Sequence, residues 1–179
     1  MIKYTKRPSV AARLGVPVAL LLGACTGIPD GVDVVGGFEL DRYLGTWYEV
    51  ARLDHSFERG LSRVTAEYSL REDGGVRVVN RGFDAAEGGW DEAEGKAYFI
   101  DAADIGRLKV SFFGPFYGAY NIVELDRDGY RYAMVAGPDR SYLWILARSP
   151  GLDQATLDRL VSQATRLGFP TDELIFVEH

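Results

Sequence analysis

Side chains that commonly act in catalysis are scarce in this chain, which contains one cysteine and two histidines. A nucleophilic site would have to combine His55 with Ser56 or Asp54, its neighbours on one predicted loop. Adjacent loop residues rarely reach the geometry in which a histidine activates a hydroxyl group. We therefore predict that the protein is not an enzyme, and that His55 is a solvated loop residue or a hydrogen-bond donor.

Metal or cofactor binding is not supported by the sequence either. Asp126 and Asp128 precede Gly129 as at the start of a calcium loop, but the later oxygen ligands and the distant glutamate are missing. Haem binding by an internal histidine would need a histidine within a strand, and neither His55 nor His179 falls in a predicted one. We expect no metal and no cofactor, and we interpret both aspartates as turn residues.

Cys25 is the residue whose surroundings predict a specific reaction. Residues 1–24 combine four basic side chains, no acidic one and an apolar run from Leu14 to Ala24, which is typical of a cleaved export signal. That run is shorter than the roughly 20 residues that a membrane-spanning helix needs. Leu22-Gly23-Ala24-Cys25 resembles the lipobox of bacterial lipoproteins, in which the cysteine is acylated and becomes the new N-terminus.

The expected location follows from this resemblance. Thr26 rather than aspartate follows Cys25, which in lipoproteins implies sorting to the outer membrane of an organism that has one. Several acyl chains on one residue anchor a protein stably, whereas a single chain binds a membrane only marginally. The alternative is an ordinary secretory signal cleaved near Ala24, which would leave a free or buried thiol. A disulfide within the chain is excluded because there is no second cysteine.

The charge of the chain restricts its partners. With 20 basic and 26 acidic residues the formal net charge is −6, which argues against nucleic-acid binding. Cleavage after residue 24 would leave 16 basic residues and a net charge of −10, so the folded part would not adhere to anionic lipid by charge. The length of 179 residues, of which 47% are hydrophobic, suits one globular domain.

Three segments are expected: residues 1–24 as the lipoprotein signal peptide, 25–38 as the lipidated N-terminus and tether, and 39–179 as the folded domain. Residues 26–38 are rich in glycine and show no helical or strand period. In the folded domain apolar and polar residues alternate, and compact polar turns separate the alternating runs. The expected strands are 46–53, 63–70, 76–83, 90–100, 107–113, 117–125, 130–136 and 141–148.

Short strands in series, joined by linkers of hairpin length, predict an all-β fold: an eight-stranded up-and-down antiparallel barrel. A sandwich would usually need longer crossover connections. One α-helix is expected after Pro150-Gly151, with Asp153 as its N-cap and with Gly168 and Pro170 ending it. Its apolar stripe would pack against the outside of the barrel, and a short strand at 174–177 would pair along the barrel edge.

Three stretches of the sequence resemble the conserved stretches of the lipocalin family. They are Gly45-Thr46-Trp47 at the start of the first strand, Asp126 after the sixth strand and Arg148 at the end of the eighth. Residues 120–130 and 144–150 are similar to the branch that contains bacterial lipocalins and apolipoprotein D. The chain is therefore identified as a bacterial lipocalin of the outer-membrane lipoprotein type.

This resemblance spans about residues 38–179 and implies a lipocalin barrel whose narrow end is closed by Trp47, with Arg148 packed across the ring. A cation stacked on an indole contributes about 0.5–2 kcal/mol. The barrel-closing motif would consist of Gly45, Trp47, Asp126 and Arg148. The second stretch departs from the family, since the sequence reads Leu125-Asp126-Arg127 where Thr-Asp-Tyr is usual.

A barrel of eight strands is filled by side chains alone or holds one small ligand as well. Small residues would leave space if they faced inward: Ala51, Ala66, Ala93, Gly95 and Ala97. The candidate ligand-binding residues are Ala51, Tyr68, Phe112, Tyr120, Tyr132 and Trp144. Strand parity could turn some of them outward.

The resemblance implies a membrane-anchored protein that carries or stores a fatty acid or lysophospholipid in the barrel. An apolar rim at the open end would suit exchange with a membrane, and its residues would be Phe57, Leu61, Phe83, Trp90, Phe113 and Phe116. These side chains could instead pack the loops onto the barrel. The alternative function is that of a structural envelope lipoprotein with a filled barrel that acts through protein partners. The sequence leaves open whether two copies form a homodimer.

Overall fold

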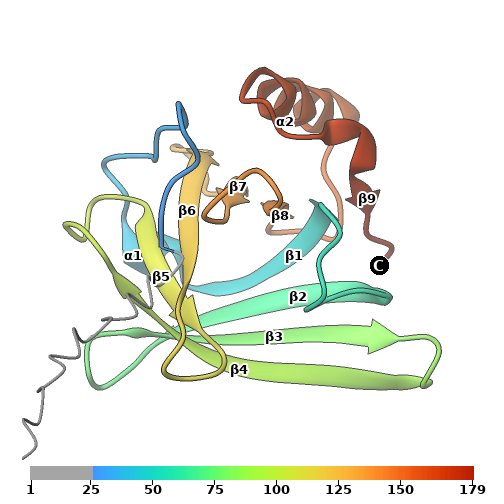
Figure 1. The fold of residues 1–179 in the computed structure, drawn as a ribbon, viewed down its shortest axis with the longest axis horizontal. Coiled ribbons are helices and arrows are strands. Elements are labelled where there is room, and N and C mark those ends of the chain that lie inside the picture. Colours follow the sequence, from blue (N-terminus) through green and yellow to red (C-terminus); the bar gives the residue numbers. More distant parts are fainter. Residues whose placement is uncertain (1–25) are drawn as a thin grey trace, which may run out of the picture.

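The computed structural model describes residues 26–179, so Cys25 and the signal peptide lie outside the described residues. Eight antiparallel strands form a closed barrel (Figure 1). Each strand pairs with the next, and β1 (Gly45–Arg52) pairs with both β2 (Leu61–Leu70) and β8 (Leu143–Ala147). The other barrel strands are β3 (Val76–Asp84), β4 (Gly89–Phe99), β5 (Arg107–Ser111), β6 (Gly118–Leu125) and β7 (Tyr132–Ala136).

The predicted barrel and the predicted C-terminal helix are both confirmed. The helix α2 (Gln154–Arg166) begins after Asp153, whose carboxylate accepts a hydrogen bond of 2.9 Å from the Thr156 amide. It ends before Gly168, which takes the left-handed conformation at φ +82°, and the Phe169 amide then bonds back to the Ala164 carbonyl. Within residues 26–179, no helix is long and apolar enough to cross a membrane.

Alternation along the strands builds two separate apolar cores. One lies inside the barrel, where Trp47, Tyr68 and Ile122 meet. The other lies between the outer barrel wall and α2, where Leu160 and Ala164 pack. Figure 1 shows α2 on the side of the barrel opposite to β3 and β4, so those two strands have no helix over their outer faces.

The C-terminal residues complete the barrel wall at the open end. β1 and β2 pair only over the first half of β1, from Gly45 to Tyr48. Beyond that point β9 (Ile175–Phe176) pairs with β1, and the Arg63 amide of β2 donates to the Glu178 carbonyl at 2.7 Å. The predicted edge strand therefore fills the opening between two diverging strands. A 3₁₀ helix (Thr171–Glu173) connects it to α2.

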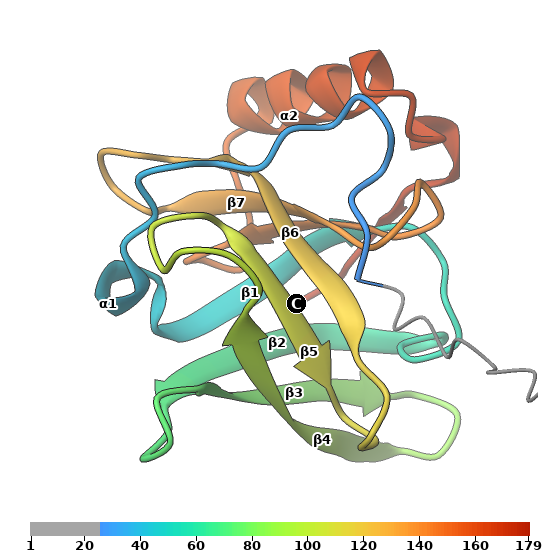
Figure 2. The ribbon, with the colours of Figure 1, turned by 60° about the vertical axis from the view of Figure 1, so that its left-hand side comes forward.

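Residues 26–38 are packed against the barrel, and Phe38 enters its inner core, in contrast to the tether expected there. Val32 and Phe38 are buried. The Val35 amide donates to the Ile122 carbonyl, its carbonyl accepts from the Gly106 amide, and Gly36 forms a β-bridge with Ile105. Figure 2 shows this segment in blue, passing beside α2 on its way to α1 (Leu40–Tyr43). Glycine-rich composition concealed these contacts because most of them use backbone groups.

Tyr43 and Trp47 close one end of the barrel. The Trp47 side chain is fully buried, its indole Nε1 donates to the Tyr43 carbonyl at 2.8 Å, and the two ring centroids lie 4.6 Å apart. The Arg148 guanidinium stacks on the opposite side at 4.0 Å from the Trp47 ring centroid. Gly45 sits at φ +92°, a left-handed conformation that favours glycine over residues with a side chain.

Arg148 also holds α1 and the beginning of β1 together through its N–H donors. It donates to the carbonyls of Arg42, Leu44 and Thr46 at 2.7, 2.9 and 2.8 Å. These carbonyls lie in α1, in the residue that follows it and at the start of β1. One planar side chain therefore satisfies several acceptors and covers the indole at the same time.

Asp126 supports this stack indirectly, through the turn that contains Tyr130 and Arg131. It does not touch Trp47; its carboxylate accepts from the Arg131 side chain and its backbone carbonyl from the Tyr130 amide at 2.8 Å. The hydrogen bond from Arg131 lowers the pKa of Asp126, which keeps the carboxylate charged. The turn held in this way presents the Tyr130 carbonyl to Arg148 Nε at 3.4 Å.

We predict that Arg148→Met lowers the free energy of unfolding by about 2–4 kcal/mol, because carbonyls that accept charged hydrogen bonds lose their donor. Methionine keeps the apolar stem over Trp47, so packing changes little. Urea denaturation of a chain that starts at Thr26 measures this effect. The control Arg77→Met removes an exposed pair with Glu94 and should change stability little. Equal effects of the two substitutions would contradict this role of Arg148.

Candidate ligand-binding site

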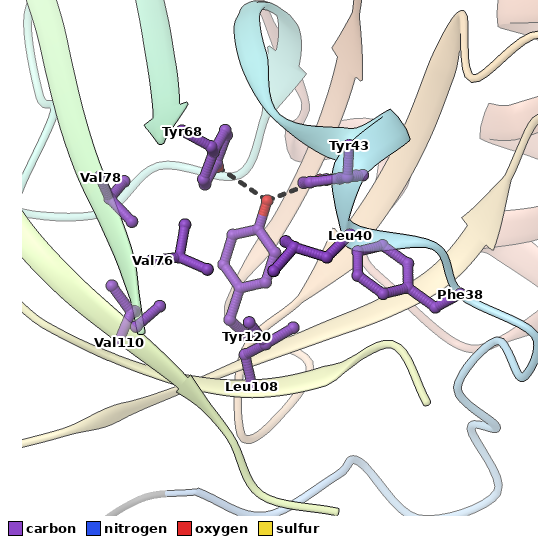
Figure 3. Close-up of a pocket in the computed structure, with 10 residues that line it drawn as sticks. Phe38, Leu40, Tyr43, Tyr68, Val76, Val78, Leu108, Val110 and Tyr120 are labelled. Atoms are coloured by element: carbon purple, nitrogen blue, oxygen red, sulfur yellow. Dashed lines mark hydrogen bonds between the residues drawn. The ribbon is translucent and has the colours of Figure 1, made fainter. Parts of the chain in front are cut away.

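A small apolar pocket lies inside the barrel next to the closed end (Figure 3). Its walls are formed by Phe38, Leu40, Tyr43, Tyr68, Val76, Val78, Ala97, Leu108, Val110 and Tyr120. The cavity volume is about 10 Å³. A single water molecule needs roughly 10–15 Å³, so this space does not hold an acyl chain. The part of the lumen next to the closed end is therefore nearly filled by side chains.

Three tyrosine hydroxyls meet in this pocket, as the dashed lines in Figure 3 show. The Tyr120 hydroxyl lies 2.7 Å from that of Tyr43 and 2.8 Å from that of Tyr68. Two hydrogen bonds use two of the three hydroxyl protons, so one proton remains for a further acceptor. Burial raises the pKa of all three tyrosines. The group is therefore neutral, and it offers a polar contact within an apolar space.

Small residues form one wall of the lumen above this pocket. In the β3–β4 pairing Val76, Val78 and Asn80 oppose Ala97, Gly95 and Ala93, and the two valines belong to the inner core. Ala66 of β2 is on the same face, opposite Asn80. Of the small residues that were expected to face inward, four lie on the inner face in the structure: Ala66, Ala93, Gly95 and Ala97.

Phe112 occupies the space that Gly95 leaves. A Cβ added to Gly95 would lie only 2.8 Å from the Phe112 ring, so the ring rests directly on the glycine. Phe112 follows β5 at the start of the loop that leads to β6, and it is half-buried. Nearer the mouth, Ala93 is exposed although it faces the lumen. The barrel is therefore open at its mouth and closed further down.

Four of the candidate ligand-binding residues pack against the inner core: Tyr68, Phe112, Tyr120 and Trp144. Ala51 does not, and this expectation is wrong. A β-bulge between Glu49 and Ala51 shifts the alternation of β1 and turns Ala51 toward α2. Tyr132 also faces outward, because Ala133 and Val135 are the inward residues of β7. The Arg159 guanidinium lies 5.1 Å from the Tyr132 ring centroid.

A buried charge cluster lies at the open end of the lumen, and sequence reasoning missed it. Arg52 is 1% exposed and donates to a Glu49 carboxylate oxygen at 2.6 Å. Its other Nη donates to the carbonyls of Glu58 and Leu61 at 2.8 and 3.1 Å, which binds the β1–β2 loop to the barrel. The sequence held one signal for this cluster. Glu49 follows Trp47 by two residues on β1, so strand alternation places its charge on the inward face.

Glu58 folds from the loop toward the barrel interior. One of its carboxylate oxygens accepts from Trp144 Nε1 at 3.2 Å and lies 3.2 Å from His55 Nε2. His55 is buried against Phe57, Tyr142 and Trp144, so the expectation of a solvated histidine is wrong. The His55 ring therefore contacts an aromatic cluster and Glu58, whereas a loop residue was expected to contact solvent.

The pKa values of the two carboxyl groups in this cluster are shifted in opposite directions. Burial and the nearby charge of Glu58 raise the pKa of Glu49 well above its ordinary value, although Arg52 opposes this shift. For Glu58 burial also favours the neutral form, but hydrogen bonds with His55, Glu49 and Trp144 outweigh it and lower the pKa. The surroundings therefore favour the protonated form of Glu49 and the charged form of Glu58. Metal-ligand groups of three or more are absent from residues 26–179.

We predict a specific pH dependence from Glu49. Its pKa is about 4.3 in an unfolded chain and higher in the folded one, so the folded state holds more protons above that pH. The free energy of unfolding should therefore fall as pH rises above the pKa that Glu49 has in the unfolded chain. Glu49→Gln keeps a neutral donor and should reduce this fall, as measured by urea denaturation at each pH. The control Glu94→Gln alters an exposed carboxylate and should follow the wild type; identical slopes for Glu49→Gln and wild type would exclude the effect.

Comparison with known proteins agrees with this geometry. Residues 38–179 match the lipocalin-like domain family. Outer membrane lipoprotein Blc of Vibrio cholerae is 56% identical over 160 residues, which cover 89% of this chain and 94% of that protein. The protein of the same name from Escherichia coli K12 is 53% identical over 173 residues, 96% of each chain. These two names support the lipid-anchored outer-membrane localisation that the sequence predicts.

Insecticyanin from Manduca sexta shares the fold with a TM-score of 0.67 at 22% identity, over 86% of this chain and 87% of that one. Apolipoprotein D of Macaca fascicularis is 33% identical over 145 residues, which cover 78% of this chain and 74% of that protein. The family match and the two bacterial relatives show that the chain belongs to the lipocalin family and is a binding protein rather than an enzyme.

Proposed function

We propose that this lipocalin carries or stores a fatty acid or a lysophospholipid in its barrel while an acylated Cys25 holds it at the outer membrane. The observation that supports this most is the wall of small inward residues, Ala66, Ala93, Gly95 and Ala97, covered at one point by a single aromatic ring. Such a wall leaves room for a chain when that ring moves. The family membership supports a binding role, and the names of the bacterial relatives support the outer-membrane location.

The energy of burying a chain is sufficient for useful affinity. About fourteen methylenes gain on the order of 11 kcal/mol at ~0.8 kcal/mol each. Association itself costs roughly 4–15 kcal/mol. At the lower end of that cost the net gain is about 7 kcal/mol, which corresponds to a dissociation constant on the order of 10 μM without a charged clamp. The ligand would be selected by the shape and length of its apolar part.

Binding requires side chains to move, because the cavity of about 10 Å³ is too small for a chain. Phe112 is the side chain best placed to do so. It lies at the edge of the β5–β6 loop, close to Phe113 and Phe116, which are exposed. Rotation of its ring away from Gly95 would join the open mouth to the tyrosine pocket. The unused tyrosine proton could then be donated to an ester, acid or hydroxyl oxygen of the ligand.

The small cavity also favours a second candidate function. A structural envelope lipoprotein with a filled barrel, which acts through protein partners, needs no interior space. The buried cluster of Glu49, Arg52 and Glu58 suits such a role because it fixes the β1–β2 loop across the mouth. The two functions differ in whether the lumen admits a ligand, which can be measured directly.

We predict that a fluorescent fatty acid binds the chain that starts at Thr26 and is displaced by lysophospholipid. Ala97→Leu should weaken binding about tenfold, since a larger side chain in the lumen excludes about two methylenes. Lys96→Leu adds the same side chain on the outer face of β4 and should leave the affinity unchanged. Fluorescence titration gives both dissociation constants. Absence of binding by the wild type would support the filled-barrel function, and equal loss in both variants would exclude the lumen as the site.

We predict that Cys25→Ala releases the protein from membranes without changing fatty acid binding, because the acyl chains are attached outside the barrel. Membrane fractionation followed by ligand titration measures both properties. Thr26→Ala, which leaves the cysteine in place, should remain with the membranes. Persistent membrane attachment of Cys25→Ala would show that another part of the protein carries the anchor.

A further inference from the structure

We infer that the open end of the barrel lies against the bilayer that holds the acyl chains of Cys25, so that a ligand passes between membrane and lumen directly. This inference rests on the proposed lipid anchor. It adds an orientation that the anchor alone does not give, since a protein on a flexible tether could present any face to the membrane. Three features of the described residues carry it.

The first feature is the position of the residue that follows the anchor. The Thr26 carbonyl accepts from Arg107 at 3.2 Å, and the Gly27 carbonyl accepts from Asn121 Nδ2 at 2.9 Å. The same Asn121 nitrogen donates to the carbonyl of Gly137 at 3.0 Å, where the β7–β8 loop begins. That loop joins strands at the open end. The chain therefore leaves the anchor beside the mouth of the barrel.

The second feature is that the segment after Gly27 is held to the barrel by hydrogen bonds. Arg140 of the same open-end loop donates to the Asp30 carbonyl at 2.5 Å. Further along, the Phe38 amide donates to the Asp104 carbonyl at the closed end. The segment is thus fixed to the barrel along its length. Consecutive Cα atoms lie about 3.8 Å apart, and no residue separates an anchor at position 25 from Thr26, the first residue held by the barrel.

The third feature is the distribution of exposed aromatic side chains. Four of them stand at the open end: Phe57, Trp90, Phe113 and Phe116, exposed by 67, 59, 73 and 67%. Aromatic residues are favoured at membrane interfaces because they combine apolar area with tolerance of water. At the closed end the exposed large apolar residue is Leu70, which stands alone. The rim aromatics and the anchor therefore face the same way.

The rim carries charges beside its aromatic side chains. Asp54 and Arg59 of the β1–β2 loop form an ion pair at 2.8 Å, Glu58 of that loop is buried, and Glu87 and Asp91 on either side of Trp90 are exposed. The net charge of −10 expected after cleavage offers no electrostatic attraction to anionic lipid. Apolar contact at the rim would therefore act as the second membrane signal beside the acyl anchor. The same face would cover a ligand during transfer, so that its apolar chain is not exposed to water.

The test uses the acylated protein, purified from membranes and placed in vesicles of phosphatidylethanolamine and phosphatidylglycerol. Phe116→Cys and Leu70→Cys each introduce one free thiol, because the natural cysteine is occupied by lipid. An environment-sensitive fluorophore on each thiol is then exposed to lipids brominated on their acyl chains. Quenching should be at least about twofold stronger at position 116 than at position 70. Five Gly-Ser pairs inserted between Cys25 and Thr26 should reduce that difference while the protein stays attached.

Each other result overturns the inference in a recognisable way. If the labelled proteins do not attach to vesicles, the anchor itself fails. If they attach but position 70 is quenched as strongly as position 116, the anchor stands and the orientation is wrong. If the label at position 116 is already shielded in the unanchored chain without vesicles, a second copy rather than a bilayer covers the rim. Ligand binding in solution is measured separately and is not affected by any of these outcomes.

Discussion

The stack of Arg148 on Trp47 is the interaction on which the rest of this structure depends. A closed sheet without a base would be a tube open to water at both ends. Here a buried indole fills the narrow end, and a guanidinium covers it while serving the carbonyls of α1 and β1. The apolar lumen can therefore exist only above this stack, and the mouth becomes the single route to it.

The lumen shows a conflict between stability and function. Interiors are most stable when they are close-packed, and this one is packed around three tyrosines and Phe112. A carrier needs the opposite, which is space that remains accessible to a ligand. In the proposed carrier the small residues of β2 and β4 and the glycine under Phe112 would reconcile the two demands, because movement of one ring off Gly95 would vacate the space.

Sequence reasoning succeeded where local rules decide the outcome. Alternation and polar turns located each barrel strand, and the N-cap Asp153 and Gly168 bounded the helix. It failed where residues far apart in the sequence determine a position. The bulge that turns Ala51 outward depends on pairing with β8, and the burial of His55 depends on Trp144. The packing of residues 26–38 depends on backbone contacts with β6 and its neighbours, which leave no pattern in the side chains.

The pairing of β9 beside β1 has a consequence for how the molecule is made. The Val177 amide donates to the Val50 carbonyl at 3.0 Å, so the first barrel strand takes this partner from residues far along the chain. Contacts of such long sequence separation form slowly. Closure of the barrel wall beside β1 is therefore expected to be a late step of folding.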